Sequence, residues 1–471
     1  MKKYLHLVFI IFLFVFTNHF SYASEVSYEQ ALERLYGSHE SIAQSEADLR
    51  EKEYLKKAAL GLYSPRFSVN AAYAYFGNDL TMDVDLTHVK NGINNVLGGL
   101  PILPLPPLNI PDTMQQVVQK DQFFTLNATM LWPVFTGGKI FAANKLATAN
   151  MNIAKAGVKV RHDELGASMA EKYFTLRFVK DVIKVKEEVR DSMQDHYNKA
   201  LKLEKAGMLA KVERLHAEMA LSEAENSLNT SIREAKLAES ALKSMINSTE
   251  DNITPSTPLF IISEEDIESL SYFQDMAVSS NAKLKQVQEG KNVAKAGVIN
   301  SVSSFVPKIN VFGMANIYDY QLTSMSPEYM VGVQMSLNLF DGLQNYHQFK
   351  ASKQTEESVK LMTLRAEKDI QTLVEQQYIT MQNAREDYMA SLKSLAFTEE
   401  YLRARQKAFN QGMATSLDVV DAELALSNSK MSAITAAYKF DMALLSMLTT
   451  SGIFDSFETY RARAFVEPGL K

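Results

Sequence analysis

The sequence predicts a mainly helical chain with a smaller membrane β-barrel part, arranged as two structural repeats. Three observations support this fold class. Segments 205 residues apart match each other, each half contains two alternating segments of about ten residues, and each half contains a helical stretch about 100 Å long. Each repeat is therefore expected to consist of a helix, two strands, a long helix and a returning helix.

The internal repeat is clearest around two glycines. Gly207-Met208 aligns with Gly412-Met413, and residues 217–222 align with residues 422–427 at the same offset. The alignment predicts the following division of the chain: signal peptide 1–23, first repeat 24–248, linker 249–263, second repeat 264–452 and C-terminal tail 453–471.

Residues 1–23 have the pattern of a secretory signal peptide. They start with two lysines, continue as an apolar run over residues 7–16 and end in small residues, so cleavage is expected after Ala23. No later window holds about twenty consecutive apolar residues, which predicts no transmembrane helix in the mature chain. The chain contains no cysteine, which excludes disulfides, thiolate metal sites and lipidation on cysteine.

Charge and motifs argue against a nucleic-acid partner and against catalysis. The formal charge is −6, whereas phosphate binding favours a basic face. Gly137-Gly138-Lys139 resembles the end of a phosphate loop, but Pro133 stands where a glycine is required and Ile140 where Ser or Thr is required. The sequence also lacks the His-Glu-x-x-His and Gly-x-Ser-x-Gly motifs. We therefore expect no catalytic site, no cofactor and no metal.

Four segments alternate between apolar and polar residues, as strands with one apolar face do. Each is about ten residues long, the length of a tilted strand that crosses a bilayer. Trp132 and Phe340 lie at strand ends and suit the aromatic belt of a membrane interface. Soluble hairpins with one apolar face are the alternative reading of the strand pattern alone. The four expected strands are near 66–76, 122–133, 308–318 and 329–340.

The first repeat contains an insertion near residues 80–118 that the second repeat lacks. Five of the twelve prolines lie within residues 100–111, which favours an extended extracellular loop without a regular helix.

The strand-to-helix joint of the first repeat combines a proline with two glycines. Pro133 is expected to end its strand because it has no N–H to donate, and Gly137 and Gly138 are expected to supply the unusual backbone angles of the turn. The second repeat keeps Gly342 but has neither the proline nor the second glycine. We therefore expect the first joint to bend more tightly than the second.

Long helices follow the strands in both repeats, within residues 139–246 and 344–450. The stretches 139–205 and 344–410 carry narrow apolar stripes typical of coiled coils, so they need long partners. Gly207 and Gly412 are expected to turn the chain, and the residues after them to return as antiparallel helices. A further single helix is expected before the first strand of each repeat, within residues 27–62 and 264–304.

A sheet in lipid has to be closed, because lipid offers no hydrogen-bond partner to an open edge. Four strands cannot close a barrel, so several copies of the chain are expected to build one together. Three copies would supply twelve strands and a ring of helices of matching width.

The order of elements, the twofold repeat, the stretch 133–138 and the stretch 412–422 together resemble the TolC-like outer membrane efflux protein family, the outer membrane factors. The resemblance covers roughly residues 25–450. It implies a homotrimer with a twelve-stranded β-barrel in the outer membrane of a Gram-negative bacterium, joined to a periplasmic α-helical barrel. It also implies docking to an inner-membrane pump of RND, ABC or MFS type through a periplasmic adaptor, and no covalent chemistry.

The resemblance also assigns candidate site residues. Two aspartates that ring the periplasmic end of the tunnel in the family match Asp418 and Asp421; without the resemblance they read as ordinary helix-surface residues. The family's closing tyrosine and arginine are replaced by Phe409 and Ala414, and the aspartate of the first hairpin is replaced by Glu213, so closure must use other contacts. The hairpin tips are candidate adaptor contacts, or plain turns: Gly207, Met208, Gly412 and Met413.

Two questions stay open at this level. Small-molecule efflux and type I protein secretion share such an exit duct, and nothing in the residues separates them. A periplasmic coiled-coil scaffold without channel activity would also explain the long helices, although it would not explain the four amphipathic strands.

Overall fold

The computed structural model describes residues 24–99, 106–250, 252–323 and 326–466. The expected signal peptide, residues 1–23, lies outside these described residues. The chain divides into two compact units. We call them the hairpin unit, which comprises Met1–Lys52, Asn150–Lys291 and Val359–Lys471, and the sheet unit, which comprises Glu53–Ala149 and Asn292–Ser358.

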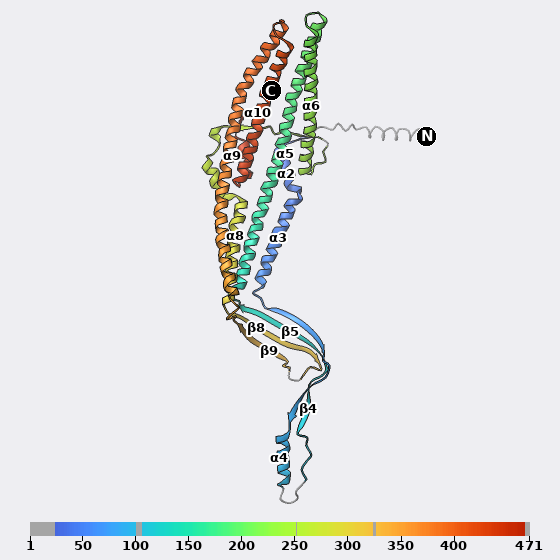
Figure 1. The fold of residues 1–471 in the computed structure, drawn as a ribbon, viewed down its shortest axis with the longest axis vertical. Helices are drawn as coiled ribbons and strands as arrows, with labels where there is room; N and C mark the ends of the chain where they lie inside the picture. Colours follow the sequence, from blue (N-terminus) through green and yellow to red (C-terminus); the bar gives the residue numbers. More distant parts are fainter. Residues whose placement is uncertain (1–23, 100–105, 251, 324–325, 467–471) are drawn as a thin grey trace, which may run out of the picture. The chain divides into compact units, whose positions relative to one another are not determined.

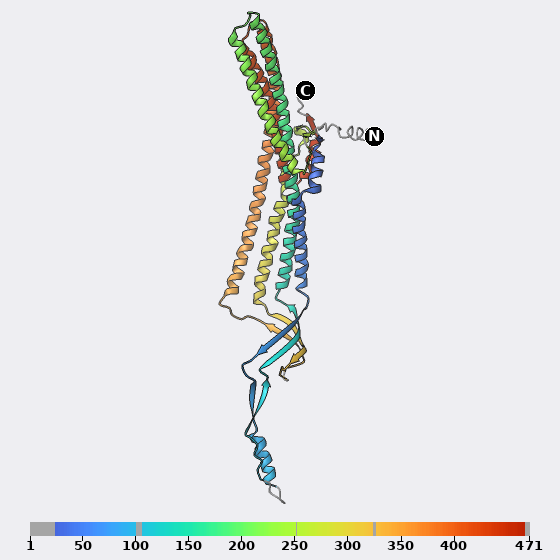
Figure 2. The same cartoon turned by 90° about the vertical axis from the view of Figure 1, so that its right-hand side faces the viewer.

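Two helical hairpins dominate the hairpin unit. The first joins α5 (Lys139–Lys205) to α6 (Lys211–Met245), and the second joins α9 (Gln344–Asn410) to α10 (Ser416–Thr450). Figures 1 and 2 show each returning helix running alongside the long helix that precedes it. Much of each apolar stripe is buried within the hairpin unit, for example Val185 of α5 and Val374 of α9, which are both 0% exposed.

The helices before the strands are each interrupted, whereas the sequence suggested single helices. The first is split into α2 (Tyr28–Ser38) and α3 (Glu40–Gly61), and the second into α7 (Leu270–Ser280) and α8 (Ala282–Val302). Both breaks fall at an extended residue, His39 and Asn281, and these lie 242 positions apart, the offset between the first strands of the two repeats.

Asn281 supplies the physical reason for the second break. Its Oδ1 accepts the Leu284 N–H at 2.8 Å, which caps α8, and its Nδ2 donates to the Thr450 carbonyl at 2.8 Å. Asparagine competes with the helix for backbone hydrogen bonds in this way, so it favours a helix boundary over a helix interior.

The segments expected to be a linker and a tail are structured parts of the core. Residues 253–255 form β6 (Ile253–Pro255), which pairs in parallel with β1 (Ser24–Val26), and β7 (Ile261–Ile262) pairs antiparallel with β10 (Ala464–Val466). Between β7 and α7 lies the short helix η1 (Glu264–Asp266). The tail also forms η3 (Phe454–Ser456) and α11 (Phe457–Arg461).

Aromatic burial explains why these two segments are ordered. The run Leu259 to Ile262 is at most 1% exposed, and Phe260 contacts Phe457 with ring centroids 5.8 Å apart. The Phe457 ring also lies against Tyr28 and Phe174. Burying such side chains offsets the entropy of ordering the backbone that carries them.

The sheet unit contains one four-stranded antiparallel sheet in the order β2-β5-β8-β9. Strand β9 ends at Ser336 rather than near residue 340, because its partner β8 begins at Lys308, which pairs with Ser336. A short helix, η2 (Ser303–Phe305), precedes β8. The strands are β2 (Arg66–Tyr75), β5 (Gln122–Phe135), β8 (Lys308–Tyr320) and β9 (Tyr329–Ser336).

The strand register places apolar side chains on one face across all four strands. One row of this face joins Val69 of β2, Ala128 of β5, Ala315 of β8 and Tyr329 of β9. The opposite face carries polar residues on β2 and β5, where Asn70 donates to Thr129 Oγ1 at 3.1 Å. Many apolar side chains of the first face are exposed: Phe67, Val69, Tyr73, Tyr75, Trp132, Ile317, Tyr329, Val331, Val333 and Met335.

The insertion has more secondary structure than its proline content suggested. It forms β3 (Leu80–Asp85), α4 (Thr87–Gly98) and β4 (Thr113–Gln119), and β3 pairs antiparallel with β4. The helix ends before the first proline, so the prolines exclude a helix only after it. Of the proline-rich stretch, residues 100–105 lie outside the described residues, and residues 106–111 are neither helix nor strand.

No helix among the described residues is long and apolar enough to cross a membrane.

The core of the hairpin unit contains a carboxyl group, that of Asp441 on α10, which is fully buried. One of its carboxyl oxygens lies 3.4 Å from the Phe260 N–H, and the other has no partner among the described residues. Burial raises the pKa of Asp441 well above its ordinary value of 3.8.

The raised pKa of Asp441 predicts how stability changes with pH. The folded chain holds a proton on Asp441 that the unfolded chain releases above about pH 4, so native stability decreases as the pH rises through this range. The variant Asp441→Asn has no titrating group at this position, so it lacks this pH-dependent contribution to the free energy of unfolding. We expect its melting temperature to rise relative to that of the native protein by about 2–4 °C between pH 5 and pH 8. The exposed Asp387→Asn on α9 serves as a control, and an equal response of both variants would contradict the assignment.

Candidate functional site

The hairpin tips are two copies of one backbone turn. Met208 N–H donates to the Leu203 carbonyl and Met413 N–H to the Ala408 carbonyl, both at 2.9 Å. Gly207 and Gly412 have φ angles of +70° and +73°, which glycine adopts without strain. Met208 and Met413 are 75% and 71% exposed. Each tip therefore presents an exposed methionine beside a glycine without a side chain.

Asp418 lies in the first turn of α10, where it completes a capping box with Thr415. Its Oδ2 accepts the Thr415 N–H at 2.8 Å, and Thr415 Oγ1 accepts the Asp418 N–H at 3.2 Å. The hydrogen bond from the Thr415 backbone holds the pKa of Asp418 below its ordinary value, and Arg405 lies 3.4 Å away. Part of the charge of Asp418 is thus already balanced within the chain.

Asp421 has a different environment, although it lies only one turn further along α10. Its side chain is exposed, and among the described residues it makes no hydrogen bond or ion pair. Residues three positions apart share a helix face, so the two carboxylates lie near each other. Of the two aspartates, Asp421 is the one whose charge no other described residue balances.

Close to the tips, the two hairpins are joined by contacts centred on Ser416, the first residue of α10. Glu213 of α6 accepts the Ser416 N–H at 2.8 Å, and Nε2 of His196 on α5 lies 2.7 Å from Ser416 Oγ. The ring of Phe409 lies 4.8 Å from the ring of His196. Glu213 and Phe409 thus both take part in the contacts between the hairpins.

The same contact between α5 and α10 continues as a polar seam away from the tips. Ser192 donates to Glu423 at 2.7 Å, and Lys430 pairs with Glu188 at 2.6 Å. Glu423 is 6% exposed, and burial raises its pKa. Sequence reasoning missed this seam, although the spacing of seven residues between Ser416, Glu423 and Lys430 was a usable signal.

The two strand-to-helix joints each contain two consecutive residues with positive φ. These are Gly137 and Gly138 with φ of +63° and +94°, and Gly342 and Leu343 with φ of +68° and +69°. The tighter bend expected at the first joint stays a prediction. Leu343 adopts the strained conformation without the help of a glycine.

Pro133 does not end its strand, contrary to the sequence-based expectation. Strand β5 continues to Phe135, and Pro133 pairs with Asn310 of β8. The reason is that β2 pairs with β5 only as far as Leu131, so no neighbour on that side requires a hydrogen bond from residue 133. The register shifts between Pro133 and Phe135, where the strand leaves its regular pairing.

The two proposed interface aromatics are both exposed. Trp132 is 43% exposed, and its indole N–H donates to the Tyr63 carbonyl at 3.0 Å. Phe340 is 79% exposed and lies beyond the end of β9. A side chain with an apolar ring and one satisfied polar atom, such as Trp132, suits a membrane interface.

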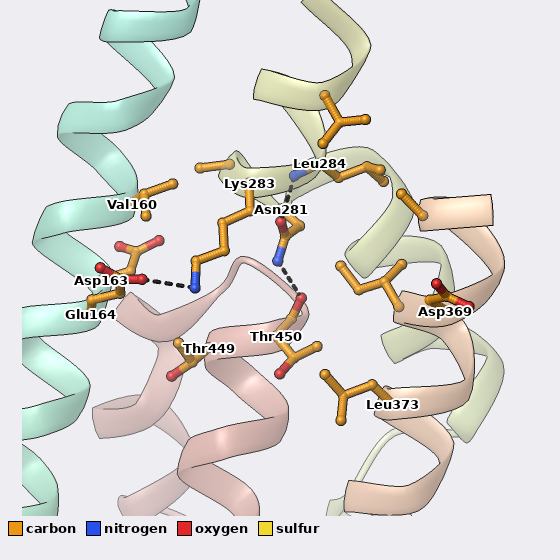
Figure 3. Close-up of a pocket in the computed structure, with 14 residues that line it drawn as sticks. Val160, Asp163, Glu164, Asn281, Lys283, Leu284, Asp369, Leu373, Thr449 and Thr450 are labelled. Carbon is orange, nitrogen blue, oxygen red and sulfur yellow. Dashed lines mark hydrogen bonds and ion pairs between the residues drawn. The ribbon is translucent and has the colours of Figure 1, made fainter. Parts of the chain in front are cut away.

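A cavity of about 400 Å³ lies within the hairpin unit among α5, α8, α9 and α10 (Figure 3). Lys283 reaches across it to Glu164 at 2.7 Å, and Asp369 pairs with Arg365 at 3.4 Å. Each charged group of the lining has such a partner, including Asp163, which pairs with Lys159. A ligand site would need free polar groups that converge, so this cavity does not have the character of a substrate site.

The one group of described residues that could hold a metal ion comprises His162, Asp163 and Asp455. Nζ of Lys159 lies 3.3 Å from a carboxylate oxygen of Asp163 and 3.5 Å from one of Asp455. The ammonium group thus already balances the charge that would attract a cation.

The glycines of the two joints form a matched pair for a stability test. A Cβ at Gly137 would lie 2.8 Å from the Ser303 carbonyl oxygen, whereas a Cβ at Gly342 would meet nothing within 4 Å. Gly342→Ala should cost only the left-handed strain of about 1–2 kcal/mol. Gly137→Ala should cost clearly more, because backbone atoms have to move. Thermal unfolding of both variants in detergent measures the difference, and equal losses would contradict this account of the first joint.

Comparison with known proteins identifies the family to which the chain belongs. The family model of outer membrane efflux proteins matches residues 31–248 and 274–452, and no curated protein matches. Three solved structures have a similar fold, each with a TM-score of 0.71. They are VceC of Vibrio cholerae (15% identity, 90% of this chain and 96% of that chain), CmeC of Campylobacter jejuni (11%, 93% and 89%) and MtrE of Neisseria gonorrhoeae (14%, 91% and 89%). Because the family model covers most of its length, the chain belongs to the outer membrane efflux proteins, a family of outer membrane transport channels and not of enzymes.

Proposed function

We propose that this protein is the outer membrane exit duct of a tripartite export system. In this role three copies form one channel, which receives cargo from an inner-membrane pump through a periplasmic adaptor and releases it outside the cell. The observation that carries the proposal is the four-stranded sheet, which has one apolar face and two unpaired edges.

The edges of the sheet are suited to joining identical copies. Among the described residues, β2 pairs only with β5, and β9 pairs only with β8. All neighbouring strands are antiparallel, so the two edges of a four-stranded sheet run in opposite directions. Strand β9 of one copy can therefore pair antiparallel with β2 of the next, and a ring of copies closes without an edge.

The apolar face of the closed ring would point toward lipid. Strands β2, β5 and β8, with 10, 14 and 13 residues, are long enough to cross the apolar layer when tilted, and β9 with 8 residues is slightly shorter. Three copies give twelve strands, the number implied by the family resemblance. Polar residues such as Asn70 and Thr129 would then line the interior.

The tips of the hairpins are the proposed docking surface for the adaptor. Gly207 and Gly412 carry no side chain, so a partner helix can approach the backbone closely, and Met208 and Met413 offer adaptable apolar contacts. The pump could be of RND, ABC or MFS type. The family name favours small-molecule efflux over type I protein secretion.

Purification and electrical recording test the proposed function directly. We expect the full-length mature protein to require detergent, to be trimeric, and to form discrete channels in planar bilayers. A protein that is soluble without detergent and forms no channels would support the periplasmic scaffold instead.

The two aspartates of α10 should contribute unequally to ion selectivity. In the trimer they would supply six carboxylates around one axis, which favours cations. Asp421→Asn should lower the cation-to-anion permeability ratio about twofold or more, because the exposed carboxylate loses its charge. Asp418→Asn should change it less, because Arg405 already offsets that charge. Reversal potentials in a salt gradient measure both, and an equal or reversed order would remove Asp421 from its proposed place in the constriction.

A further inference from the structure

The contact between α5 and α10 near the tips includes a row of polar side chains, beside a small apolar cluster around Met193 of α5. Ser416, Glu423 and Lys430 of α10 face His196, Ser192 and Glu188 of α5. Polar groups buried at such positions stabilise a contact only while every partner remains in place. A change in the charge of one member would therefore weaken the whole seam.

His196 is the member whose charge can change near neutral pH. It is 6% exposed, and the groups around its ring come from its own helix α5 and from α6, α9 and α10. On α5 the nearby charged group is Lys199, on α6 it is Glu213, α9 contributes the Phe409 ring, and α10 contributes the Ser416 hydroxyl.

We propose that His196 makes the junction of the two hairpins sensitive to acid. A neutral imidazole holds Ser416 at the start of α10, and protonation of the ring loosens α10 from α5. The consequence for transport, an easier opening of the periplasmic end at low pH, depends on the proposed function; the local change in packing does not.

The surroundings of His196 disfavour the charged form. The ring lies at the N-terminus of α10, where the helix dipole is positive, and Lys199 adds a second positive charge. Glu213 is the one carboxylate that opposes this, and it is already engaged with the Ser416 N–H. Burial, the largest effect, lowers the pKa of His196 from its ordinary value of 6.5.

The sign of the effect follows from this lowered pKa. At pH values well above 6.5 the imidazole ring is neutral in both the closed and the open junction. Closing the junction then requires no release of a proton from His196. As the pH falls below 6.5, the open form binds a proton that the closed form excludes, so the closed junction loses stability.

Glu423 works in the opposite direction, because burial raises its pKa above 4.5. As the pH rises above 4.5, the open junction releases the Glu423 proton more readily than the closed junction does, so the closed junction loses stability. Acid therefore favours the closed junction at this site. A decisive experiment must separate the two groups.

The absence of cysteine from the chain makes thiol labelling a clean probe. Ala422 of α10 is fully buried beside Glu423, so an Ala422→Cys variant reports access to the junction. The control is Ala414→Cys, located at the tip before α10 begins. Dividing the two labelling rates at each pH removes the intrinsic pH dependence of the thiol reaction.

We expect the labelling ratio of full-length protein in detergent to rise about twofold or more between pH 7.5 and pH 5.5, because the open junction binds a proton on His196 that the closed junction excludes. With His196→Gln, which keeps a hydrogen-bonding side chain but cannot be charged in this range, the ratio should stay flat. With Glu423→Gln the rise should persist or grow, because the opposing group is gone.

Two results would overturn the proposal: a flat ratio in the protein with native His196, or an equal rise after His196→Gln. If His196→Gln does not fold, Ser416→Ala provides the second test. It removes the hydroxyl that His196 holds, so labelling should already be high at pH 7.5, and low labelling there would also contradict the proposal. Labelling needs no channel activity, so these results are independent of whether the protein conducts.

Discussion

The unsatisfied edges of the four-stranded sheet are the constraint on which the rest of the structure depends. Strands β2 and β9 each have one edge that no described strand pairs with, while one face of the sheet carries exposed apolar side chains such as Phe67 and Val331. In water the apolar face is unfavourable, and in lipid each unpaired backbone group costs several kcal/mol. In the proposed channel both problems are solved together, because the sheet closes with other copies of itself. The helices that continue from β5 and follow β9 would then form a ring as well.

The long helices also carry apolar side chains that have to be buried, and they bury them by packing against other helices. A helix of 67 residues cannot be buried in one compact core, so α5 and α9 are each covered by their returning helices. Near the tips, however, the contact between hairpins combines a small apolar cluster with the polar side chains of Ser416, Glu423 and Lys430. Polar contacts stabilise less than an apolar seam of the same size and can be broken at lower cost. The chain therefore has a firmly packed middle, around Phe174 and Phe440, and a more weakly held end.

The sequence was sufficient for the features that depend on local pattern. The long helices follow from uninterrupted periodicity, the tips from Gly207 and Gly412, and the strands from alternation over about ten residues. What it could not supply depends on distant partners. The linker and the tail are structured because Phe260 packs against Phe457, almost 200 residues away. The length of β9 is set by the residue at which β8 begins. The role of His196 was hidden for the same reason, because its partners are on three other helices.

The two repeats show which parts of the site are dictated by the backbone and which by side chains. Both joints require two left-handed residues, and the second repeat meets this requirement with Leu343 where the first uses Gly138. Both tips use the same hydrogen bonds, yet α6 starts without a side-chain cap at Ala210 while α10 starts with the Thr415 capping box. The backbone geometry is thus a property of the repeat. The capping box of Thr415 and Asp418 has no counterpart at the start of α6, so the two hairpins share a backbone turn and differ in the side chains that begin the returning helix.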